Sequence, residues 1–293
     1  MKRFALILLS LLMVMSLTSC TSLLEKAKSI VTGEEISVPP EDFIASKENE
    51  LYTYDEYVDY ICLTAYLGSD TELVLPDTID GKPVRELGSL FLYECEGITS
   101  VVIPASVEVI RESAFYYCDE LLSITVPSGV SLIGSRAFAW CLSLKEVVIN
   151  ANITAIPDYC FNRCIALETV TLPASVTKIG VRAFSYCDAA VDITLPDGVT
   201  EIGDLAFSGC ALLNYVEVPD SAATLGKDIF SGSESVVVIA PESSAAKAYC
   251  AENSLRWSTS RSIPAYVPGA DGGATDSSSD LSSAESEADG SVE

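Results

Sequence analysis

The sequence contains no histidine among its 293 residues, so it lacks the side chain that most often serves as a general base and as a zinc ligand. A Ser-His-Asp catalytic arrangement is therefore excluded. The chain also has no G-x-S-x-G segment, no P-loop and no G-x-G-x-x-G fingerprint. These absences predict a protein that is not an enzyme, with no catalytic residue, no metal site and no cofactor. An enzyme remains conceivable only if acidic side chains gather into a carboxylate cluster.

Basic residues are scarce, with 17 lysines and arginines against 42 acidic residues and a formal net charge of −25. A chain this acidic repels the phosphate backbone, so nucleic acid is not an expected partner. The same charge disfavours direct docking on anionic lipid headgroups.

The N-terminal segment MKRFALILLSLLMVMSLTSC has two basic residues, a short apolar run and then small and polar residues before Cys20. This layout is typical of a secretory signal peptide, and the run is too short for a comfortable membrane span. Residues 17–20 (Leu-Thr-Ser-Cys) resemble the lipobox of bacterial lipoproteins, in which the cysteine carries a diacylglyceryl group. The resemblance implies a secreted protein, anchored at the bacterial cell surface through lipid on Cys20. The alternative is an ordinary signal peptide with a chance cysteine.

A repeat of 23 residues without gaps occupies the middle of the chain. One unit reads VVIPASVEVIRESAFYYCDELLS, and six units begin at Val101, Ile124, Val147, Val170, Ile193 and Val216. Proline recurs in one column, at Pro104, Pro127, Pro173, Pro196 and Pro219. Phenylalanine recurs in another, at Phe115, Phe138, Phe161, Phe184, Phe207 and Phe230.

Each unit begins with alternating apolar residues, which predicts a short strand with one buried face. Proline has no N–H to donate and closes this strand. A second short extended piece follows, and then Gly134, Gly180 or Gly203 permits a tight bend. The A-F-x-x-C stretch returns as a turn. Because no unit can bury its apolar side alone, stacking of the units predicts one continuous core.

The units resemble the BspA-like leucine-rich repeat family, whose consensus runs roughly L-x-x-V-x-I-P-x-S-V-x-x-I-G-x-x-A-F-x-x-C. The match covers about residues 72–257, and it departs from the pattern at Leu92 in the phenylalanine column and at Ser233 in the cysteine column. The resemblance implies a leucine-rich-repeat solenoid, mostly β with a small C-terminal capping helix. It also implies adherence to host matrix proteins or to other bacteria.

The N-terminal segment, the repeats and the acidic C-terminal composition together divide the chain into six predicted segments. Residues 51–72 form an N-terminal cap with a hairpin over residues 51–69, and residues 241–262 form a C-terminal cap with a helix over about 244–253. The full division is signal peptide 1–19, lipidated cysteine and polar spacer 20–50, N-terminal cap 51–72, repeats 73–240, C-terminal cap 241–262 and disordered acidic tail 263–293.

Ten cysteines are present, and six of them recur every 23 residues, at Cys95, Cys118, Cys141, Cys164, Cys187 and Cys210. A single column of equivalent atoms gives no pairing rule, so buried thiols that act as small apolar side chains are expected. Secretion would nevertheless permit disulfides.

Two stripes of residues are candidates for partner binding. The first lies one residue before the cysteine column and contains Tyr117, Trp140, Arg163 and Tyr186. Aromatics and arginine are favoured at interface hot spots, although these rings could merely shield the turns beneath them. The second stripe lies on the outward face of the first strands and includes Thr125, Val148 and Thr171.

The predicted function is a non-catalytic, monomeric surface lipoprotein that binds an extracellular or envelope protein through its repeats, with the membrane contacted only through the lipid. The alternative is a structural or scaffolding envelope lipoprotein that recognises a partner of its own cell or a glycan.

Overall fold

The computed structural model describes residues 41–261. The predicted signal peptide, Cys20, most of the predicted spacer and the predicted tail lie outside the described residues. The chain divides into two compact units, Met1–Phe43 and Ile44–Glu293. Residues 41–43 of the first unit are described, and Phe43 is the first residue of the first strand.

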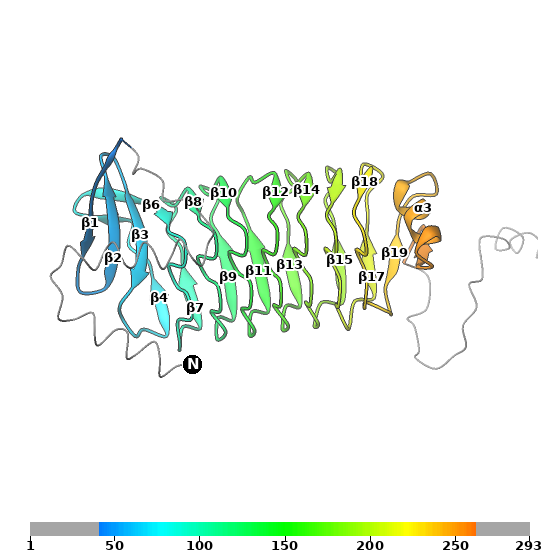
Figure 1. Ribbon diagram of the computed structural model, residues 1–293, viewed down its shortest axis with the longest axis horizontal. Helices are drawn as coiled ribbons and strands as arrows, with labels where there is room; N and C mark the ends of the chain where they lie inside the picture. Colours follow the sequence, from blue (N-terminus) through cyan, green and yellow to red (C-terminus); the bar gives the residue numbers. More distant parts are fainter. Residues whose placement is uncertain (1–40, 262–293) are drawn as a thin grey trace, which may run out of the picture. The chain divides into compact units, whose positions relative to one another are not determined.

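The repeats form a β-solenoid in which each unit contributes one coil, as predicted (Figure 1). The first strands of the coils pair in parallel with an offset of 23 residues, so that Val147 lies between Ile124 and Val170. One parallel sheet contains β4 (Glu72–Val74), β7 (Ser100–Val102), β9 (Ser123–Val126), β11 (Glu146–Ile149) and β13 (Thr169–Thr171). A second contains β15 (Asp192–Thr194), β17 (Tyr215–Glu217), β19 (Val237–Ile239) and β20 (Arg256–Ser258).

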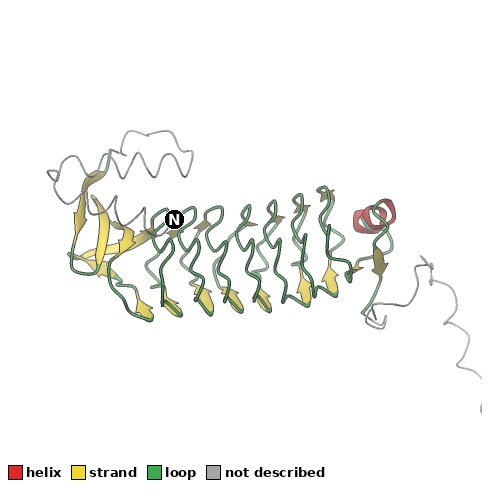
Figure 2. Cartoon of the chain, turned by 60° about the horizontal axis from the view of Figure 1, so that its bottom comes forward, coloured by secondary structure: helices red, strands yellow, loops and turns green. Residues whose placement is uncertain are grey.

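A two-residue strand follows in each coil and pairs with its equivalents along another line of the solenoid (Figure 2). These strands are β8 (Val109–Ile110), β10 (Leu132–Ile133), β12 (Ala155–Ile156), β14 (Lys178–Ile179), β16 (Glu201–Ile202) and β18 (Thr224–Leu225).

The phenylalanine column forms the centre of the core. Successive rings from Phe115 to Phe230 stack nearly parallel, with centroids 5.1–5.7 Å apart. The predicted inward positions of the strands are buried around them, except Val170 and Leu172, which are half-buried. Leu92 is also buried in this column, and the position before it holds Phe91, where the next two coils have Ala114 and Ala137.

The line of first strands and the line of second strands are each interrupted once, and the sequence offers a reason in each case. Between β10 and β12, Pro157 stands where Gly134 and Gly180 donate N–H bonds to the preceding coil. Proline has no such hydrogen, so the bond is lost. Between β13 and β15, Ala190 occupies the column that holds Leu167 in the preceding coil and Leu213 in the next, and its smaller side chain fills less of the core.

The glycines that follow the second strands have a different role from the predicted one. Gly134, Gly180 and Gly203 do not have positive φ values, so conformational freedom is not the reason for them. A Cβ atom at these positions would lie 2.3–2.6 Å from the backbone of the preceding coil at Gly134 and Gly180, and 2.7 Å from it at Gly203. Glycine is therefore needed here because the backbones of adjacent coils approach closely.

The N-terminal cap is a sheet built on the predicted hairpin. Strands β2 (Tyr52–Tyr57) and β3 (Ile61–Tyr66) pair antiparallel, and β3 pairs in parallel with β6 (Lys82–Leu87). The strand β6 also pairs antiparallel with β5 (Thr78–Ile79) and in parallel with β8, the first of the two-residue strands.

The predicted spacer was wrong at its C-terminal end, because residues 43–48 form the edge strand β1 (Phe43–Glu48) on β2. Polar cross-strand contacts hold this strand: Ser46 donates to Asp55, and Lys47 pairs with Glu56. Its side chains are mostly exposed, so its composition resembled that of a spacer.

The predicted C-terminal helix is present as α3 (Ala245–Glu252), with Ser244 at its N-cap and Asn253 at its C-cap. Tyr249 covers the end of the phenylalanine stack, because its ring lies edge-on to Phe230 and its hydroxyl accepts a bond from the backbone N–H of Ile229. Across residues 41–261, no helix is both long and apolar enough to span a membrane.

All nine cysteines of the described region are free thiols, and those from Cys118 to Cys210 in the repeat column are buried. The buried cysteines of this column also form hydrogen bonds. Each thiol donates to the backbone carbonyl of the residue in the phenylalanine column 26 residues earlier, as Cys164 does to Phe138 at 3.2 Å. Ser233 makes the same bond to Phe207 at 2.8 Å, so a hydroxyl can replace the thiol.

We predict that Cys118, Cys141, Cys164 and Cys187 resist alkylation in the native protein and react once it is denatured. Burial raises the pKa of each of these thiols well above its usual value, so little nucleophilic thiolate is present. Cys95 is half-buried, and burial raises its thiol pKa to about 11. Mass spectrometry after labelling at pH 8 should therefore find Cys95 modified first among the column cysteines. An intact disulfide between two of them, or rapid native labelling of the buried four, would contradict the prediction.

Candidate functional site

The predicted stripe lies at a left-handed backbone position in every coil. The φ angles of Tyr117, Trp140, Arg163 and Tyr186 lie between 61° and 64°. A second left-handed column lies four residues earlier, with φ between 52° and 58°, at Ser113, Arg136, Tyr159, Arg182, Leu205 and Asp228. Such angles are uncommon outside glycine, and in these turns they recur with the repeat.

Hydrogen bonds between coils explain why these strained angles are kept. The N–H groups of Trp140, Arg163 and Tyr186 each donate at 2.8 Å to a carbonyl of the next coil. The N–H groups of the phenylalanine column and of the earlier left-handed column do the same. The return turns thus form a third hydrogen-bonded line along the solenoid, and these bonds offset the cost of each left-handed residue, about 1–2 kcal/mol.

The stripe forms one continuous stack, which we call the ladder (Tyr117, Trp140, Arg163 and Tyr186). The rings of Tyr117 and Trp140 stack with centroids 4.8 Å apart. The guanidinium carbon of Arg163 lies 4.6 Å from the ring centroids of both Trp140 and Tyr186, which is cation–π geometry on both faces. The structure therefore brings all four predicted residues together.

The ladder extends beyond the predicted residues at one end and stops at the other. Tyr116 lies edge-on to Tyr117 and stacks on Tyr93, which adds two rings at the N-terminal end. At the C-terminal end the ring of Tyr186 covers Gly209, where a Cβ atom would lie 2.7 Å from the ring. Glycine is required there to admit the ring.

A second, shorter stack, which was not predicted from the sequence, lies in the other left-handed column. The guanidinium carbons of Arg136 and Arg182 lie 4.8 and 5.7 Å from the ring centroid of Tyr159. Arg182 also donates to the Tyr159 hydroxyl at 3.1 Å, and Arg136 pairs with Glu112 at 2.9 Å. The alternation of arginine and tyrosine every 23 residues was visible in the sequence and could have revealed it.

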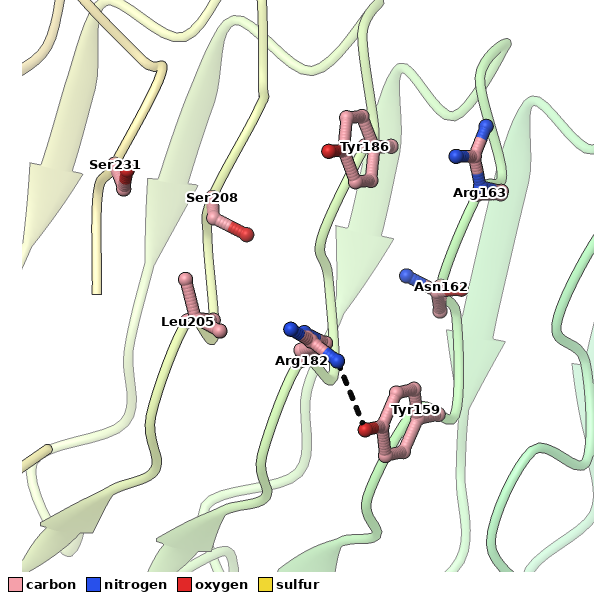
Figure 3. Close-up of a pocket in the computed structure, with 8 residues that line it drawn as sticks. All are labelled: Tyr159, Asn162, Arg163, Arg182, Tyr186, Leu205, Ser208 and Ser231. Atoms are coloured by element: carbon pink, nitrogen blue, oxygen red, sulfur yellow. Dashed lines mark hydrogen bonds between the residues drawn. The ribbon is translucent and has the colours of Figure 1, made fainter. Parts of the chain in front are cut away.

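A polar, open groove of about 320 Å³ separates the two stacks (Figure 3). Arg182 and Tyr159 lie on one side, and Arg163 and Tyr186 lie on the other. The remaining lining residues are Asn162, Leu205, Ser208 and Ser231.

The repeat pattern identifies the family. The BspA type leucine-rich repeat region matches residues 85–191 and 178–254, with six copies. The match spans more than half of the chain. The chain belongs to the BspA-type leucine-rich repeat family.

Solved structures with this architecture include bacterial leucine-rich repeat proteins. The leucine-rich repeat protein of T. pallidum is 30% identical over 67% of this chain and 82% of its own, with a TM-score of 0.51. A leucine-rich repeat protein from Eubacterium ventriosum is 23% identical over 67% of this chain and 51% of its own, with a TM-score of 0.56. A leucine-rich cell surface protein from Faecalibacterium prausnitzii is 24% identical over 68% of this chain and 76% of its own, with a TM-score of 0.41. No curated protein matches the sequence.

The second predicted stripe lies on a different segment of the BspA-type coil. Thr125, Val148 and Thr171 are paired neighbours on β9, β11 and β13, and the two threonines are exposed. They belong to the first strands, whereas the ladder belongs to the return turns. Farther along the same strand face, Arg261 bonds to three side chains across β15 and β17: Asp192, Thr194 and Glu217.

The comparisons indicate no enzyme family, and BspA-type repeats are typically a binding scaffold. Within residues 41–261, no group of three or more cysteine, aspartate or glutamate side chains is arranged to hold a metal ion.

Proposed function

We propose that this protein is a non-catalytic surface lipoprotein that binds a protein partner through the ladder. Its mature N-terminus would carry lipid on Cys20, and its partner would be a host matrix component or another cell. The family match and the solenoid support a binding role.

The observation that carries the proposal is the continuous stack of rings and guanidinium on the return turns. Tyrosine, tryptophan and arginine dominate the binding energy of protein interfaces. Here their side chains are already fixed by stacking and by a hydrogen-bonded backbone, so little conformational entropy remains to be lost on binding. The ladder is also partly open to solvent, with Tyr186 exposed to 44%.

The test begins with capture of a partner by the full-length lipoprotein in detergent, from extracellular matrix components and from bacterial surface proteins. Capture of a host matrix protein, or of a surface protein from another cell, supports the proposal. Exclusive retention of a glycan would contradict it. So would exclusive retention of a partner from the protein's own envelope, since that outcome favours a scaffolding lipoprotein.

We predict that Trp140→Ala weakens binding of the captured partner by about tenfold or more, because truncation of a central aromatic side chain commonly costs about 2 kcal/mol. Trp257→Ala is the matched control. Trp257 is the other tryptophan of the chain, and it also has a cation over its ring, that of Lys247 at 4.6 Å. Affinity measured by surface plasmon resonance should fall for the Trp140 variant only, with circular dichroism confirming that both are folded.

Removal of residues 264–293, which contain seven acidic residues and no basic ones, should leave the affinity nearly unchanged. Loss of binding on this deletion, or normal binding by a folded Trp140 variant, would contradict binding through the ladder. In the latter case Thr125, Val148 and Thr171 become the next surface to mutate.

A further inference from the structure

We infer that the groove between the two stacks binds a carboxylate on the partner, presented by a glutamate or aspartate side chain in an extended peptide segment. This inference rests on the proposed function and specifies the chemistry of the partner. Arg163 and Arg182 are the residues that receive the carboxylate.

The first observation is that these two arginines have no carboxylate partner among the described residues, in a chain that is rich in carboxylates. Eight other described basic residues form ion pairs within 4.0 Å: Lys47, Lys82, Arg85, Arg111, Arg136, Lys178, Lys247 and Arg261. Lys145 and Lys227 are not paired either, but both are exposed and neither lines the groove. Arg163 and Arg182 line it together.

The second observation is how the guanidinium of Arg163 is held. Trp140 and Tyr186 occupy its two faces at 4.6 Å, so the side chain is fixed and its N–H groups remain available only around the edge of its plane. A carboxylate is the acceptor that fits this edge, because it can accept two parallel N–H bonds in the same plane.

Arg182 faces the same groove from the adjacent coil. One of its N–H groups donates a hydrogen bond to the Tyr159 hydroxyl, which orients the guanidinium and leaves its other N–H groups for a ligand (Figure 3). Asn162 is already engaged, since its amide donates to the Ser185 carbonyl at 3.2 Å. Two oriented arginines therefore supply the charge, whereas the Asn162 amide is occupied within the protein.

The net charge of −25 favours a ligand with a single negative charge over a polyanion. A densely charged polyanion would carry many charges against an acidic surface and be repelled. One carboxylate among uncharged residues meets mainly the two arginines, because salt screens charges beyond about 8 Å.

The groove also has the dimensions for a peptide. Its lining residues come from four consecutive coils, Tyr159 in the first and Ser231 in the last. With strands about 4.8 Å apart, this corresponds to roughly 14 Å, the length of about four extended residues. Leu205 offers these residues an apolar contact and the exposed Ser231 offers a polar one, whereas the buried Ser208 hydroxyl is already hydrogen-bonded to that of Ser185 at 2.7 Å.

The experiment titrates the full-length lipoprotein, labelled with ¹⁵N-arginine, with a blocked Ala-Ala-Glu-Ala-Ala peptide at 150 mM salt. We expect saturable shifts of the Nε–Hε signals of Arg163 and Arg182, and no shift with the peptide in which glutamine replaces glutamate. Arg163→Lys and Arg182→Lys should each weaken the binding by about tenfold, since lysine keeps the charge but loses the planar pair of donors. Arg111→Lys is the matched control and should change nothing, because Arg111 is paired with Glu86 and belongs to neither stack.

Equal binding of the glutamine peptide, or full binding by both lysine variants, would overturn the inference. Tighter binding of heparin than of the glutamate peptide would overturn it too, in favour of a sulfated glycan. The captured partner separates this inference from the proposed function. If Trp140→Ala abolishes partner binding while the lysine variants bind it normally, the ladder is the interface and the groove takes no carboxylate. If the peptide binds as expected but Trp140→Ala leaves partner binding unchanged, the groove stands and the proposed function fails.

Discussion

Phe184→Ala is expected to lower the free energy of unfolding by about 3–5 kcal/mol, the usual cost of removing a buried phenylalanine ring. The side chain is fully buried, and its ring lies between those of Phe161 and Phe207 with centroids 5.4 and 5.5 Å away. Tyr186→Ala is the matched control, because it removes an aromatic ring of similar size two residues later that is 44% exposed. Urea unfolding followed by circular dichroism should show a loss below about 1 kcal/mol for that variant.

The position of Phe184 within the stack adds a second expectation. Each coil of a solenoid contacts only its neighbours, so a lesion in the middle can uncouple the two halves. Unfolding of the Phe184 variant should therefore broaden or separate into two transitions. Equal losses for the two variants would show that the phenylalanine stack does not hold the coils together.

The fold could be predicted because the repeat states the same local pattern six times. Alternating apolar residues, the proline that closes each strand and the phenylalanine column all follow from burial, and burial has a fixed period. The C-terminal helix was confirmed as well, with Ser244 and Asn253 as its caps. Strand β1 was not predicted, because polar pairs rather than apolar burial hold it.

The geometry of the site could be predicted only in part. The register placed Tyr117, Trp140, Arg163 and Tyr186 on neighbouring coils, and the structure stacks them. Their left-handed backbone was not predicted, because tyrosine, tryptophan and arginine rarely adopt it. Gly209 and Gly232 occupy the same column with positive φ and were the available signal.

The groove could not be predicted from single columns. It depends on how far the side chains of two columns reach across the turn, and on which arginines find a carboxylate. The interruptions in strand pairing also depend on single side chains, such as Pro157 and Ala190, which a consensus sequence does not contain. A periodic sequence thus specifies the scaffold, whereas the departures from the period create the local features.

Cys20→Ala is expected to remove the protein from the membrane fraction, or to leave it as the unprocessed precursor, and to abolish fatty-acid incorporation. Each methylene group of an acyl chain contributes about 0.8 kcal/mol to membrane binding, so two chains provide an anchor that a body with a net charge of −25 cannot replace on an anionic surface. Cys160→Ala is the matched control. It makes the same exchange at a column that already holds alanine in other coils, at Ala137 and Ala183 among them. Detergent phase partition and intact mass should show lipid on the wild type and on the Cys160 variant, and none on the Cys20 variant. A Cys20 variant that is cleaved at the same site and stays in the membrane fraction would show that the protein is held there by something other than lipid on this cysteine.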